Sequence, residues 1–172
     1  MSTGTVTMDR QGPEDYDNQR FYEYIVIRRR SLWWNDVNFL AECVKFAGSR
    51  PWVWSDKIWH CPLSEFAANM PKYVLQSNWF YGPEFELDPE KNKQAVRVKG
   101  FLDLNELGYD QLPTGSNFMY PENFPHMVDF CTKNIKNVLG YMCFPCRGCL
   151  AKYEHEYIDC ADVSQKAYAQ LS

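Results

Sequence analysis

Short apolar runs alternate with helix-length segments along this chain, and this alternation limits the folds that it can adopt. The runs expected to form strands lie at residues 52–55, 73–77, 109–112 and 138–144. The segments expected to form helices lie at residues 21–46, 63–70, 94–107, 124–135 and 150–169. Gly48 and Gly108 follow two of these segments, where a helix commonly ends. Such alternation predicts an α/β protein with a parallel sheet and right-handed crossovers.

The length of the chain decides between a closed barrel and a smaller α/β structure. Its 172 residues hold four to five βα units, whereas a closed eight-stranded barrel needs about 250 residues. An open α/β sheet and the C-terminal part of a barrel both fit this length. A half-barrel would expose apolar strand edges, so it would need a second copy of itself or a missing N-terminal half.

Composition argues against several classes of protein. The net charge of −4 and the pI of about 5.4 disfavour a nucleic-acid partner, whose binding surface would be basic. No apolar run is long enough to predict a membrane span, and the first residues lack the basic and apolar regions of a signal peptide. Seven cysteines, an odd number, predict free thiols in a reducing compartment. We therefore expect a cytoplasmic protein without a membrane or nucleic-acid partner.

Polar and aromatic residues follow the first strand at 52–55. Asp56 comes directly after this strand, between Trp54 and Trp59, and His60 comes next. Sites in parallel α/β proteins lie at the carboxyl ends of the strands. A carboxylate between indole rings at such an end suits a sugar, because it would accept hydrogen bonds from the sugar hydroxyl groups. Two other roles fit the same residues: Asp56 as a helix N-cap, and His60 as a surface or capping side chain.

A second cluster follows the strand at 73–77. It contains Asn78, Trp79 and Tyr81. Trp79 would form a stacking wall for a sugar ring, while Asn78 and Tyr81 would supply hydrogen bonds. The alternative is aromatic packing in the core, beneath the helices.

The last two strands also end in polar residues. Asn117 closes a small polar loop after the third strand, and Arg147 follows the fourth, where it would bind an anionic group or remain solvated. Cys143, Cys146 and Cys149 are spaced two residues apart, which suits a zinc or iron–sulfur site. Because Cys143 lies inside an apolar run, we interpret it as a small hydrophobic residue and predict no metal and no cofactor.

Several of these motifs resemble the second half of TIM-barrel glycoside hydrolases. The resemblance lies in residues 54–56, 70–75, 78–82, 108–109 and 139–141. It is closest to the β-N-acetylhexosaminidases of glycoside hydrolase family twenty and their uncharacterised bacterial relatives, and it covers most of the chain from residue 21. It implies that Asp56 and the strand-end tryptophans line a sugar subsite.

The resemblance also implies a catalytic pair at the end of an earlier strand. In that family an aspartate holds the acetamido group of the substrate, and the neighbouring glutamate is the general acid. Asp9 matches the aspartate, but Arg10 stands in place of the acid, and an arginine does not give up a proton near neutral pH. Hydrolysis would therefore need an acid from Asp9, Glu14 or a missing segment.

These observations lead to one expected architecture and two expected functions. We expect a loop with a remnant strand over residues 1–20, and a partial (β/α) TIM barrel over residues 21–172. The favoured function is carbohydrate binding at the strand ends, with Asp9 and Asp56 as catalytic candidates if the chain hydrolyses a glycoside. The alternative is a non-catalytic structural protein, a degenerate barrel fragment that pairs with itself or with another chain.

Overall fold

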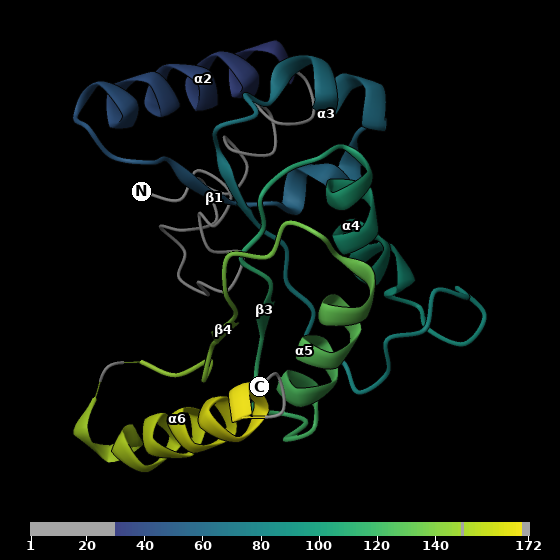
Figure 1. Ribbon diagram of the computed structural model, residues 1–172, viewed down its shortest axis with the longest axis vertical. Helices are drawn as coiled ribbons and strands as arrows, with labels where there is room; N and C mark the ends of the chain where they lie inside the picture. The colour runs from purple at the N-terminus through teal and green to yellow at the C-terminus, as the bar shows by residue number, and fades with distance from the viewer. Residues whose placement is uncertain (1–29, 149, 170–172) are drawn as a thin grey trace, which may run out of the picture. The chain divides into compact units, whose positions relative to one another are not determined.

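The computed structural model describes residues 30–148 and 150–169 (Figure 1). Contacts between Cα atoms divide the chain into two compact units, Met1–Leu75 and Gln76–Ser172. The boundary falls inside the domain predicted from residue 21. The loop and remnant strand predicted over residues 1–20 lie outside the described residues.

The first unit is built on two packed helices. Its elements are α2 (Arg30–Phe46), β1 (Trp52–Trp54), the 3-10 helix η2 (Asp56–His60) and α3 (Leu63–Asn69). The buried side of α2 carries Trp34 and Val37, spaced as expected for one helix face. The indole Nε1 of Trp34 donates to Glu65 of α3 at 3.0 Å. Phe66 of α3 is fully buried, and its ring meets Trp34 edge-on, with centroids 5.8 Å apart.

The second unit alternates strands and helices to its end. Its elements are β2 (Leu75–Ser77), α4 (Ala95–Glu106), β3 (Thr114–Gly115), α5 (Asn123–Asn134), β4 (Met142–Cys143), the 3-10 helix η3 (Ala151–Tyr153) and α6 (Glu154–Ala169). The β2 strand begins at the last residue of the first unit.

Three strand segments of the second unit are parallel neighbours in chain order. Thr114 of β3 pairs with Met142 of β4. Isolated parallel bridges join Gln76 to Gln111, and Gln111 to Val138. β2 therefore lies next to the segment that leads into β3, which lies next to the segment that leads into β4. The prediction of parallel strands joined by helical crossovers is confirmed for this unit.

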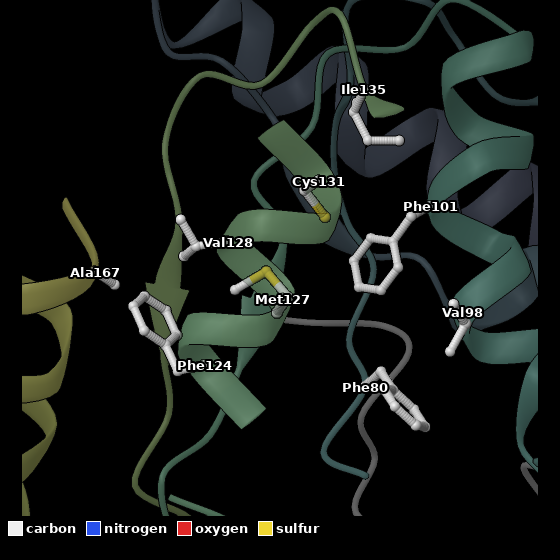
Figure 2. Packing of buried hydrophobic residues seen from close by; sticks show 9 residues of the cluster. All are labelled: Phe80, Val98, Phe101, Phe124, Met127, Val128, Cys131, Ile135 and Ala167. Atoms are coloured by element: carbon white, nitrogen blue, oxygen red, sulfur yellow. The ribbon is translucent and has the colours of Figure 1, made fainter. Parts of the chain in front are cut away.

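The core of the second unit lies between the strands and the three long helices. Its buried residues are Phe80, Val98, Phe101, Phe124, Met127, Val128, Cys131, Ile135 and Ala167 (Figure 2). They come from the segment after β2, from α4, from α5 and the loop after it, and from α6. One continuous cluster thus holds all three helices of this unit against its strands.

Apart from the third strand, the predicted elements are confirmed in the described residues, with shifted ends. The helix predicted over residues 21–46 is described from Arg30 onward. Gly48 and Gly108 end helices as predicted, with left-handed φ angles of 75° and 74°. The third strand differs more: Gln111 forms a bridge, but the regular strand begins only at Thr114. Pro113 lies between them and has no N–H to offer the ladder.

The sequence pattern did not predict η2. This 3-10 helix occupies the polar and aromatic stretch after β1. None of the helices described in the structure is both long and apolar enough to cross a membrane.

The buried phenol of Tyr109 is expected to lower the stability of the protein at alkaline pH. Its side chain is 0% exposed, and burial raises its pKa to about 12. A tyrosine in an unfolded chain ionises at about pH 10. Stability is therefore complete below about pH 10 and falls as the pH rises towards about 12, because the unfolded chain loses the proton first.

We expect the unfolding free energy to fall by about 1 kcal/mol more in the wild type than in Tyr109→Phe between about pH 9 and about pH 11. Urea unfolding of both proteins at the two pH values measures this difference. Equal losses in the two proteins would show that Tyr109 does not carry the effect.

Candidate functional site

The segment that follows β2 turns one face towards α4 and the core of the second unit. Asn78 is fully buried, and its Nδ2 donates to the Arg97 carbonyl of α4 at 2.8 Å. Phe80, two residues later, belongs to the core. Because side chains alternate along an extended strand, Ser77 and Trp79 lie on the opposite face. Asn78 therefore anchors its strand to α4, which differs from the sugar-binding role predicted for it.

A pair of hydroxyl groups forms the floor of this opposite face. The Oγ of Ser77 and the Oγ1 of Thr114 are 2.9 Å apart, and both side chains are buried. Thr114 is the parallel partner of Trp79 on one side and of Met142 on the other. The face thus runs across three neighbouring strands in one register.

Trp79 stands at the end of the first of these strands, within a stack of side chains. Its ring centroid is 4.9 Å from that of Tyr81, with 33° between the planes. The guanidinium carbon of Arg97 lies 4.2 Å from the centroid of the Trp79 ring. Trp79 and Tyr81 are both half-buried. The cation and the second ring hold the indole in place at the strand end.

The loop after β3 is fastened by Asn123, the first residue of α5. Its Nδ2 donates to the carbonyls of Phe80 at 3.0 Å and Gly82 at 2.6 Å. Its Oδ1 accepts the backbone N–H of Ser116 at 2.9 Å. One buried amide therefore ties the loop that carries Tyr81 to the loop that carries Asn117.

Asn117 brings an unusual acceptor to the end of β3. Its Oδ1 is buried, and no hydrogen-bond partner for it lies within the part of the chain that the structure describes. Most buried polar atoms in proteins are hydrogen-bonded. An acceptor in this state is therefore suited to a ligand that donates a hydrogen bond.

The loop after β4 holds Arg147 in a fixed position. Its Nε donates to Oε2 of Glu156 at 2.7 Å, and its guanidinium carbon is 4.0 Å from the ring centroid of Phe118. Cys146, just before it, has a left-handed φ of 55°, which is uncommon for a residue other than glycine. Its Sγ lies 3.5 Å from the Oγ of Ser116. The loops after β3 and β4 are thus joined to each other.

Four predicted site residues belong to the first unit. Trp54 ends β1 and is half-buried, with its ring centroid 5.4 Å from that of Trp52. Asp56 begins η2 and is half-buried, while Trp59 and His60 end this helix. His60 is exposed. Asp56 is not an N-cap, because Ser55 precedes η2 and Pro62 precedes α3.

The cysteine run is divided in the structure. Cys143 lies in β4 and packs against the core, Cys146 lies beside Ser116, and Cys149 lies outside the described residues, as does Asp9. Among the residues that the structure describes, no three histidine, cysteine or acidic side chains are grouped to hold a metal ion.

The structure also has an open hollow at the amino end of β4, away from the strand ends described above. It is lined by Thr132, Ile135, Val138, Leu139, Gly140 and Tyr141. Tyr141 shares a hydrogen bond of 2.7 Å with Thr132 there. None of the predicted site residues lines this hollow.

Comparison with known proteins finds no matching family model, no matching curated protein and no matching solved structure. The resemblance to glycoside hydrolases therefore rests on the short sequence motifs alone.

The sequence patterns did not single out Ser77 or Asn123, and they placed Thr114 in a loop. Ser77 is one residue from Asn78 in a predicted strand, so the period of two already placed them on opposite faces. No local pattern marks Asn123, because its three partners come from two different loops, one of them about forty residues away in the sequence.

Proposed function

We propose that the second unit is the C-terminal part of a (β/α) barrel and that it binds a carbohydrate at the carboxyl ends of its strands. Its strands are parallel, follow one another in chain order and are separated by helices. This is the arrangement of successive units in a barrel, where sites lie at the carboxyl ends.

One observation carries the proposal: three neighbouring parallel strands end at the same edge in groups suited to a sugar. Trp79 and Tyr81 follow β2, Asn117 follows β3, and Arg147 follows β4. Because neighbouring strands are about 4.8 Å apart, the three ends span a width comparable to one or two sugar rings. The buried hydroxyl groups of Ser77 and Thr114 lie beneath this edge.

The chemistry of these groups matches a neutral or acetamido sugar. The aromatic rings present apolar surface to the C–H face of a pyranose, and Tyr81 adds a hydroxyl group. The amide of Asn117 both donates and accepts, and Arg147 donates to ring or acetamido oxygens. Small-molecule sites commonly combine aromatic walls with a few fixed polar groups in this way.

The proposal is one of binding and does not include hydrolysis. A glycosidase needs two carboxyl groups on either side of the scissile bond. The carboxylate of Glu156 is already paired with the guanidinium of Arg147. Asp9 lies outside the described residues, and Asp56 belongs to the other unit. Among the described residues of the second unit, the arrangement assigns no general acid.

Thermal unfolding with a panel of sugars tests the proposal, because a ligand that binds only the native state raises the Tm. The panel includes N-acetylglucosamine and its thiazoline analogue. We expect one sugar to raise the Tm of the wild type by a few degrees at concentrations about 100 times its Kd. Asn117→Ala should weaken this sugar about tenfold without lowering the Tm of the free protein, because the lost oxygen has no hydrogen bond in the described structure.

Two tryptophan variants separate the site from general damage. Trp79→Ala should abolish the sugar-dependent shift, whereas Trp52→Ala, on β1 of the first unit and 45% exposed, should retain it. Equal responses in the two variants would contradict the proposal. A Tm that no sugar changes would favour the alternative, a non-catalytic structural protein that pairs with another chain.

A further inference from the structure

The packing of α6 on β4 sets two cysteine thiols beside each other. Tyr168 of α6 is the first point of attachment: its hydroxyl accepts the N–H of Tyr141 at 2.8 Å and donates to the carbonyl of Tyr141 at 3.1 Å. Cys143 lies two residues further along the strand, a distance of about 6.6 Å. Ser164 lies four residues before Tyr168 in α6, about 6 Å along the helix. Cys160 lies one further turn before Ser164.

The side of α6 that faces the strand is the buried one. Cys160 is 7% exposed and Ala167 is 2% exposed. Val163 packs against the same core as Cys143. The thiol of Cys143 forms a hydrogen bond with the side chain of Cys160, and it also interacts with the side chain of Ser164. The register thus sets Cys143 level with Ser164, and the side-chain contact shows that its thiol also reaches Cys160, one turn earlier in α6.

We propose that Cys143 and Cys160 form a disulfide under oxidising conditions and that this bond fastens α6 to β4. Both thiols are free in the structure. The closed loop would join the last strand of the unit to its last helix. The proposal is independent of sugar binding, since neither cysteine belongs to the proposed carbohydrate site.

The step is a thiol–disulfide exchange with oxidised glutathione as the oxidant. The thiolate of one cysteine attacks glutathione disulfide, forms a mixed disulfide and releases one glutathione thiolate. The thiolate of the second cysteine then attacks the protein sulfur of the mixed disulfide, so the new S–S bond forms and a second glutathione leaves. Two protein thiols lose two electrons, and glutathione disulfide gains them.

The environment of the pair makes this exchange slow at neutral pH. Burial, together with the hydrogen bond from Cys160, raises the pKa of the Cys143 thiol. Since the thiolate is the attacking species, the reaction is best followed at mildly alkaline pH.

Peptide mapping after oxidation of the full chain tests the proposal. Trypsin releases residues 137–147, which contain Cys143 and Cys146, and residues 153–166, which contain Cys160 alone. In a Cys146→Ser variant, a linked pair of these peptides identifies the bond without ambiguity. We expect this linked pair, with a mass about 2 Da below the sum of the reduced peptides, and we expect the Tm of the oxidised variant to rise by roughly 5–10 °C.

Three results would overturn the proposal. The first is recovery of the two peptides separately, each as a mixed disulfide with glutathione or as a free thiol. The second is a link formed at the wild-type yield in Cys143→Ser, which would assign the bond to Cys146. The third is a linked peptide pair without any rise in Tm, which would show that the bond does not fasten α6. Cys160→Ser should lose the link in the same way as Cys143→Ser.

Discussion

Replacing Asn123 by alanine is expected to lower the free energy of unfolding by about 4 kcal/mol. The side chain is fully buried and makes hydrogen bonds with three backbone groups, the carbonyls of Phe80 and Gly82 and the N–H of Ser116. Alanine leaves all three without their partner in a place that water does not reach, and each unsatisfied buried group costs about 1–3 kcal/mol. The urea midpoint of the variant measures the loss.

Asn134→Ala is the matched control for this variant. Asn134 ends the same helix, is exposed, and makes a local bond to the Phe130 carbonyl at 2.7 Å. Its removal should cost less than about 1 kcal/mol. A loss for Asn123→Ala as small as that of the control would show that the amide does not tie the two loops together. Because these loops carry Tyr81 and Asn117, the variant should also weaken any sugar that the strand ends bind.

Replacing Phe101 by alanine is expected to cost about 4 kcal/mol, since it empties the centre of the second unit's core. The ring is 0% exposed and lies between the strands and the helices (Figure 2). Its centroid is 6.4 Å from the ring centroids of both Phe85 and Phe130. The loss combines the transfer of the ring to water with the cavity that it leaves.

Phe46→Ala is the control for the core variant, because Phe46 is 96% exposed at the end of α2. It should change the unfolding free energy by less than about 0.5 kcal/mol. Both variants are compared by urea unfolding at neutral pH. Similar midpoints for the two would contradict the assignment of Phe101 to the centre of the core.

The regular elements could be predicted because their signals are local. Trp34, Val37 and Ala41 recur at helical spacing, and Gly108 adopts the left-handed φ that ends α4. The parallel arrangement followed from the alternation of strands and helices. The break in the third strand was not predicted; it falls at Pro113, which has no N–H to donate to the ladder.

The details of the candidate site could be predicted less well because they depend on tertiary contacts. A period of two predicts that Asn78 and Trp79 point to opposite faces, but only the position of α4 decides that Asn78 forms a hydrogen bond with its backbone. The clamp made by Asn123 joins segments about forty residues apart in the sequence. The stack of Arg97 on Trp79 likewise joins a helix to a strand end. No local pattern encodes these pairs.

The most direct test of the account is the indole N–H signal of Trp79 in a sugar titration followed by NMR. Trp79 is the only tryptophan after Leu75 in the sequence, and the other five precede it. Its signal is assigned by its loss in Trp79→Phe. The account predicts a saturable shift of this signal with the sugar that raises the Tm, together with a shift of the Asn117 backbone amide. An unchanged Trp79 signal at saturating sugar, or shifts confined to the five earlier tryptophans, would contradict carbohydrate binding at these strand ends.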